Sequence, residues 1–154
     1  MPLTPNVNSY VSASEADTYF QDRMGAEEWE ALSTADKEKT LVSATDMLDS
    51  LCTWNGEKTT PTQPLEFPRD GDIEVPVDIK TSQINIALAM VIEGEYIYNV
   101  ESQDLTGVKA GSVNLTLSES VNSNPFLNTT TKQKLRKYGT CMFGGSIQCV
   151  PLVR

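Results

Sequence analysis

The feature that most constrains the fold of this 154-residue chain is a segment near its middle that is apolar on almost every side. From Ile84 to Ile92 only Asn85 is polar. A helix that is apolar nearly all round must be covered on most of its surface by other elements, so it belongs at the centre of a core. We therefore expect a central helix from about Val77 to Tyr96 or Tyr98.

Three more helices are predicted ahead of this one. Ser12 and Glu15 have the spacing of a capping box, which starts a helix that should run to about Arg23. A short segment over 26–32 should bury Trp29, and a longer helix should cover 34–51. Its buried stripe is expected at Leu41, Ala44, Thr45, Leu48 and Leu51. Its solvent face is expected at Lys37, Lys39, Asp46 and Asp49.

The rest of the chain is expected to be less regular. Residues 1–11 should be extended, and prolines and glycines in 52–76 are too closely spaced for a long helix. The apolar residues among them predict an ordered loop fixed to the domain, with Trp54, Leu65, Phe67 and Pro68 as core or anchoring residues. Alternation of Val113, Leu115 and Leu117 with polar residues predicts a strand, and Val108 could belong to its hairpin partner.

These elements predict a mainly α protein: a small helical bundle with an inserted or appended β-hairpin and an extended C-terminal tail. The expected divisions are an extended segment over 1–11, a helical body over 12–98, a loop and hairpin over 99–124, and a short helix with the tail over 125–154. The last helix should cover Thr129 to Tyr138 and close at Gly139.

Composition limits the class of protein. The first residues lack the basic start and apolar run of a signal peptide, and the longest apolar stretch is far shorter than the ~20 residues of a membrane span. The three cysteines, Cys52, Cys141 and Cys149, are an odd number, which favours reduced, partly buried thiols. Without histidine, three cysteines are too few for a tetrahedral zinc site.

Charge is divided unevenly along the chain. The formal net charge is −9, but residues 1–78 carry 16 acids and 5 bases whereas residues 79–154 carry 5 acids and 7 bases. An acidic body repels the phosphates of nucleic acids, so wrapping of DNA over the whole surface is not expected. A negative wall could instead line a passage through which DNA slides without being held.

No catalytic motif is present, and we expect no enzyme, no metal and no cofactor. The absence of histidine excludes Ser–His and Cys–His catalysis. Asp70-Gly71-Asp72 resembles part of a calcium loop but lacks the other ligands, so a turn explains it equally well. Glu27-Glu28-Trp29-Glu30 is more simply a solvated face beside a buried tryptophan.

One basic cluster stands out at the end of the chain, and it leaves two interpretations open. Its members are Lys132, Lys134, Arg136 and Lys137. Four charges are a small electrostatic footprint, so a solvated helix face is the simpler interpretation. The functional interpretation is contact with phosphate or with an acidic partner.

An ordered set of short motifs resembles a known family. The set includes Ser9-Tyr10-Val11-Ser12, Glu15 to Phe20, Trp54-Asn55-Gly56, Gln63 to Arg69 (Gln-Pro-Leu-Glu-Phe-Pro-Arg) and Val75-Pro76. In this order and spacing it resembles the head–tail connector, or adaptor, proteins of tailed bacteriophages. Part of that group carries the description DnaT-like single-stranded-DNA-binding protein. The resemblance covers residues 9–98, and beyond them only the general order of elements is shared.

The resemblance implies a structural virion protein of the head–tail junction, assembled in the host cytoplasm, without membrane contact. It implies a homo-oligomeric ring, commonly of twelve copies, beneath the portal protein, which extends the channel for packaged DNA and joins tail proteins. The C-terminal segment would contact the portal through Ile147, Val150, Leu152, Val153 and Arg154. The predicted hairpin would contact a neighbouring copy through Val108, Val113, Leu115 and Leu117. The alternative function is binding of single-stranded DNA, with Lys132 to Lys137 as its contacts.

Overall fold

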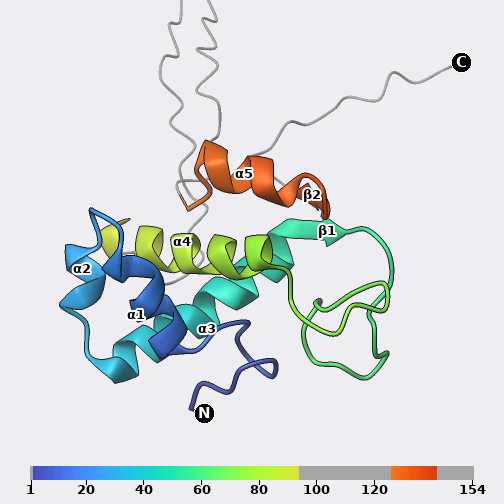
Figure 1. Ribbon diagram of the computed structural model, residues 1–154, viewed down its shortest axis with the longest axis horizontal. Helices are drawn as coiled ribbons and strands as arrows, with labels where there is room; N and C mark the ends of the chain where they lie inside the picture. Colours follow the sequence, from blue (N-terminus) through green and yellow to red (C-terminus); the bar gives the residue numbers. More distant parts are fainter. Residues whose placement is uncertain (1, 94–125, 142–154) are drawn as a thin grey trace, which may run out of the picture.

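The computed structural model describes residues 2–93 and 126–141 (Figure 1). Its elements are α1 (Ala13–Gln21), α2 (Glu27–Glu30), α3 (Thr34–Leu51), β1 (Cys52–Trp54), α4 (Val77–Glu93), α5 (Thr129–Leu135) and β2 (Gly139–Cys141). The described part is a small, mainly helical domain with one two-stranded antiparallel sheet. This confirms the predicted fold class.

Helix α4 is the centre of the core, as its apolar sequence predicts. It packs against α3, α5 and α2, and Figure 1 shows it between α3 below and α5 above. Ile79, Ile86 and Ala87 are fully buried on it. Three covering helices explain why this helix needs almost no polar face within the described residues.

The N-terminal segment is fixed to the core by a buried amide. Gln83 of α4 is fully buried, and its side-chain Nε2 donates to Ser9 Oγ at 2.7 Å and to the Leu41 carbonyl oxygen at 2.9 Å. Its Oε1 accepts from the Tyr10 backbone N–H at 3.1 Å. A buried amide is tolerated only when its polar atoms are bonded, and here the bonds join the segment before α1, α3 and α4.

The helix starts follow the sequence signals. Ser12 Oγ accepts from the Glu15 N–H, and the Glu15 carboxylate accepts from the Ser12 N–H, which completes the predicted capping box of α1. Ser33 caps α3 by accepting from the Asp36 N–H. Both helices therefore begin where a side-chain oxygen satisfies a backbone donor.

The proline-rich loop is ordered largely as predicted. Leu65, Phe67 and Val75 are buried, and the Phe67 ring meets the Trp54 ring edge-on at 4.8 Å between centroids. Arg69 fixes the loop by donating to the Asn55 carbonyl at 2.8 Å and to the Glu66 carboxylate at 2.8 Å. The expectation that the loop packs its own apolar residues is wrong for Ile73, which is 93% exposed.

The strand pair and the cysteines correct two expectations. Residues 52–54 form β1, not loop, and pair antiparallel with β2, so that Cys52 lies opposite Cys141. These two cysteines form a disulfide, which contradicts the prediction of reduced thiols. Gly139 does not end a helix but lies in β2, where a Cβ would clash with the Thr53 carbonyl oxygen. The pairing joins positions 89 residues apart, and no local pattern in the sequence reveals it.

Two charged residues of α3 do not lie on a simple solvent face. The Lys37 side chain is only 13% exposed and its ammonium lies 2.9 Å from the Asp17 carboxylate. Asp49 is half-buried and accepts from the Tyr10 hydroxyl. Lys39 and Asp46 are exposed as predicted.

Some predictions fall on residues outside the described ranges. The hairpin with Val108, Val113, Leu115 and Leu117 lies there, as does the tail after Cys141. Helix α5 starts at the predicted Thr129, capped by Asn128, but ends at Leu135 instead of Tyr138. Within the described ranges, none of the helices has the length and apolar content needed to cross a membrane.

Candidate interaction surfaces

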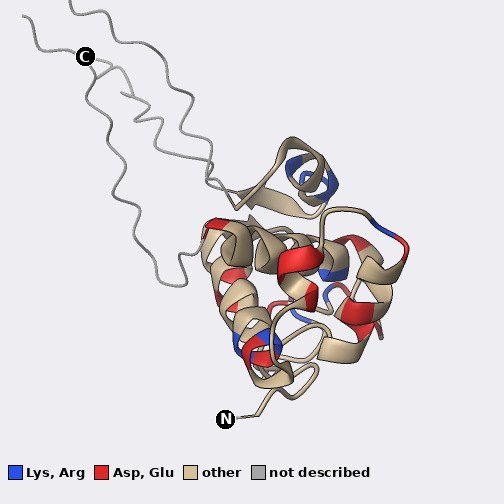
Figure 2. Ribbon diagram, turned by 90° about the vertical axis from the view of Figure 1, so that its left-hand side faces the viewer, with Lys and Arg blue, Asp and Glu red and all other residues tan. Residues whose placement is uncertain are grey.

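The first candidate surface is α5 with the residues that follow it. Residues 126–141 contain four bases and no acid, whereas residues 2–93 contain 17 acids and 6 bases, a net charge of −11. In Figure 2 the ribbon of α5 carries blue positions and lies apart from the other helices, on whose ribbons red predominates. The structure thus places the predicted basic cluster on α5, which packs on α4, and on the two residues that follow it.

Part of this positive charge is already paired with the body. The Lys137 ammonium forms an ion pair with the Asp78 carboxylate at the start of α4, and the Tyr138 hydroxyl donates to the same carboxylate at 3.3 Å. The bond from Lys137 holds the pKa of Asp78 below its usual value, and the same pair raises the pKa of Lys137. These contacts fasten the end of α5 to the first turn of α4.

The other three cations differ in their surroundings. Lys134 is half-buried and donates to Thr81 Oγ1 of α4 at 3.3 Å. Lys132 is also half-buried, whereas Arg136 is exposed. The basic cluster therefore presents its charge from a helix that is packed on the body through Leu135, which is fully buried.

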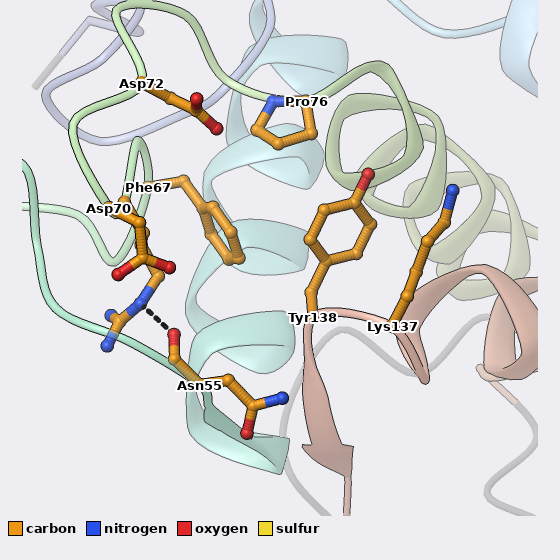
Figure 3. A pocket seen from close by; sticks show the side chains of 8 residues that line it. Asn55, Phe67, Asp70, Asp72, Pro76, Lys137 and Tyr138 are labelled. Atoms are coloured by element: carbon orange, nitrogen blue, oxygen red, sulfur yellow. Dashed lines mark hydrogen bonds between the residues drawn. The ribbon is translucent and has the colours of Figure 1, made fainter.

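The second feature is a small pocket between the proline-rich loop and the start of β2 (Figure 3). Its volume is about 80 Å³, and it is lined by Asn55, Phe67, Arg69, Asp70, Asp72, Pro76, Lys137 and Tyr138. The Phe67 and Tyr138 rings stand nearly perpendicular, 6.0 Å apart. The Asn55 carbonyl oxygen accepts a hydrogen bond from Arg69 Nε at 2.8 Å, which Figure 3 marks with a dashed line.

This pocket has no arrangement that supports catalysis or metal binding. Arg69 is used in fixing the loop, and Asp70 accepts from the Glu57 backbone N–H at 2.9 Å. Asp70 and Asp72 lie in a turn, in which the Asp72 N–H donates to the Arg69 carbonyl oxygen at 3.0 Å. The described residues contain no group of three potential metal ligands. The pocket is too small for a nucleotide and is best understood as an imperfection in the packing of the loop.

The third feature is a groove between α1 and the first half of α4. Its volume is about 350 Å³, and its lining includes Val11, Thr18, Tyr19, Val77, Thr81 and Ile84. Val77 is 73% exposed and contributes apolar surface to this groove. We did not predict this groove from the sequence, because it depends on how two helices 60 residues apart pack together.

The predicted partner-binding residues of the tail lie outside the described ranges. They are Ile147, Val150, Leu152, Val153 and Arg154. The structure therefore brings together only the basic cluster among the predicted site residues. The groove and the pocket are surfaces that the sequence did not indicate.

A family model with the description "Putative DnaT-like ssDNA binding protein" matches residues 2–154. No curated protein matches the chain. No solved structure matches it either. The family description names single-stranded DNA, the alternative of the two functions considered from the sequence, and does not mention a connector.

Proposed function

The chain belongs to the DnaT-like family whose model it matches, and we propose that it works as a structural subunit of a phage head–tail connector. In this proposal, copies form a ring, commonly of twelve, beneath the portal in the neck of the virion. The ring extends the channel for packaged DNA and joins the tail. The subunit carries out no catalytic step and needs no cofactor.

The observation that carries the proposal is the charge of the body. Residues 2–93 have a net charge of −11, and this region includes most of the segment that resembles connectors. A surface of this sign repels phosphate at short range and does not retain DNA. That property suits the wall of a channel through which DNA must move freely.

The aromatic residues also favour a structural role. Base stacking on exposed rings is the main sequence-tolerant contribution to binding of single strands. Trp29, Trp54 and Phe67 are buried instead, and the large apolar side chains that are exposed in the described ranges are all aliphatic. The described part of the chain therefore offers no exposed Trp or Phe platform for stacking.

The contacts with partners are assigned to residues outside the described ranges. We place the portal contact at Ile147, Val150, Leu152, Val153 and Arg154, and the contact with a neighbouring copy at Val108, Val113, Leu115 and Leu117. Deletion of the tail should begin at Met142, because Thr140 and Cys141 belong to β2. The shortened chain should stay folded and should no longer bind the portal.

The second candidate function is binding of single-stranded DNA, which the family description names. It is favoured by the four cations of residues 126–141, where no acid is present. If it is correct, affinity should fall steeply with salt, by a slope of about 0.7 per phosphate contact. Replacement of Lys132, Lys134, Arg136 and Lys137 by glutamine should then abolish binding.

One experiment separates the two functions. Light scattering gives the mass of the chain alone, with the portal from the same genome, and with a labelled single strand. A ring that forms only with the portal, together with no DNA binding at moderate salt, is the result expected for a connector. Tight, salt-dependent DNA binding without portal association would overturn the connector proposal in favour of the second candidate.

A matched pair of variants sharpens this experiment. The test variant is Arg136→Gln, which removes an exposed cation without touching the contacts to α4. The control is Arg23→Gln, which removes an exposed cation that stacks on the Tyr19 ring, outside α5. Loss of affinity for DNA in the first variant alone would indicate a phosphate contact at Arg136. Equal affinity of the two variants for DNA would show that Arg136 makes no such contact.

A further inference from the structure

The groove between α1 and α4 has walls that call for an apolar occupant. Three hydroxyl groups in its lining are already bonded: Thr18 donates to the Ser14 carbonyl, Thr81 to the Asp78 carbonyl, and Tyr19 to Asn85. They therefore offer mainly hydrocarbon surface beside the exposed Val77. The lining also contains Lys80 and Glu15, whose charges are paired at 3.3 Å. Exposure of such an apolar surface to water is unfavourable in free energy, and covering it with apolar side chains is favourable.

We propose that, in the free chain before any portal is bound, residues 142–154 of the same chain lie in this groove. Their sequence, Met-Phe-Gly-Gly-Ser-Ile-Gln-Cys-Val-Pro-Leu-Val-Arg, contains apolar side chains at intervals and no acid. Its single charge is that of Arg154, opposite in sign to the body. The segment is thus apolar, as the groove is, and its charge is opposite in sign to the net charge of the body.

The position at which the segment begins supports the same occupant. The Tyr138 hydroxyl reaches the Asp78 carboxylate, and Asp78 is next to Val77 in the groove lining. The segment starts at Met142, directly after β2 (Gly139–Cys141) ends. Thirteen residues can extend about 43 Å, which is longer than the roughly 26 Å of α4.

The other long stretch outside the described ranges fits less well. Residues 94–125 leave α4 at Glu93, at the end of the helix opposite Val77. They carry four acids and one base, so a body with a net charge of −11 repels them. Both position and charge therefore favour the C-terminal segment.

The proposal is tested on the full-length protein, by itself. Cys52 and Cys141 are bonded to each other, so Cys149 is the thiol to which a nitroxide spin label can be attached, with mass confirming one label. In amide NMR spectra, we expect loss of signal intensity in Ser14–Tyr19 and Val77–Ile84. Reduction of the nitroxide should restore these signals. Unchanged intensity in both stretches, or loss centred elsewhere on the body, would overturn the proposal.

Two variants and one mixture complete the test. Val77→Lys should abolish the intensity loss, whereas Ile73→Lys, a change of an exposed apolar residue outside the groove, should leave it intact. In the mixture, one population of chains carries the nitroxide but no isotope enrichment. The other population is isotope-enriched but carries no nitroxide. Intensity loss in that mixture would mean that the tail of another copy occupies the groove, which contradicts the proposal. None of these results requires portal or DNA, so they are independent of the proposed function.

Discussion

The Tyr10 hydroxyl lies 2.7 Å from each oxygen of the Asp49 carboxylate, and it joins the segment before α1 to the last turns of α3. No cation pairs directly with this carboxylate in the described structure. Burial raises the pKa of Asp49 to about 6, and the hydrogen bond from Tyr10 only partly offsets that effect. Burial and the nearby carboxylate also raise the pKa of Tyr10 above its ordinary value.

The first prediction concerns the pH dependence that Asp49 produces. Because its folded pKa of about 6 is above the reference value of 3.8, the folded state binds more protons between these values. The contribution of Asp49 to the free energy of unfolding is therefore largest below about pH 4 and is lost as pH rises through about 6. Two pKa units correspond to about 3 kcal/mol.

The measurement is the difference between wild type and Asp49→Asn in urea unfolding from pH 4 to pH 8. The amide keeps an acceptor for Tyr10 and removes the buried charge. The free energy of unfolding of the variant should therefore increase relative to that of the wild type as pH rises. Asp46→Asn, at an exposed position of the same helix, is the matched control and should show no such trend. A constant difference for Asp49→Asn would show that the carboxylate is ionised at little cost.

The second prediction concerns Gln83. Replacement by leucine keeps the approximate volume but leaves the Tyr10 N–H and the Leu41 carbonyl without the amide. Unfolding free energy should fall by about 2–4 kcal/mol, since each buried group left unbonded costs about 1–3 kcal/mol. The control is Asn85→Leu, which changes a partly buried amide on α4 bonded to Tyr19 at 3.4 Å, and it should cost less. Equal losses would mean that the three bonds of Gln83 add nothing specific.

Sequence reasoning succeeded where a pattern is local. The capping box of Ser12 and Glu15, the span of α3 and the central place of α4 all follow from side chains within a few turns of one another. Such signals work because a helix start and an apolar face are decided by neighbours in the chain.

It failed where two distant segments meet. The pairing of Cys52 with Cys141 depends on the register of β1 and β2, and the burial of Asp49 depends on the path of Tyr10. The basic cluster of α5 was found because its members are adjacent in sequence, whereas the groove was missed because it is made by α1 and α4 together. We identify no feature of the sequence around Ile73 that indicates its exposure.

The third prediction concerns the disulfide between Cys52 and Cys141. It closes a loop of 89 residues, for which loss of chain entropy in the unfolded state predicts a stabilisation of about 4–5 kcal/mol. A reductant should therefore lower the midpoint of urea unfolding, and Cys149→Ala should not change that response. If alkylation of the native protein modifies all three thiols without reductant, the disulfide is absent in solution and the prediction fails.

The last prediction concerns Trp54, which is 8% exposed and packs edge-on against Phe67. Trp54→Ala should lower the free energy of unfolding by about 3–5 kcal/mol, because a large cavity opens beneath the proline-rich loop. The indole Nε1 is buried without a hydrogen-bond partner in the structure, so Trp54→Phe loses no hydrogen bond and should cost clearly less. Urea unfolding of the two variants measures the difference. A loss under about 1 kcal/mol for Trp54→Ala would show that the indole is not part of the core.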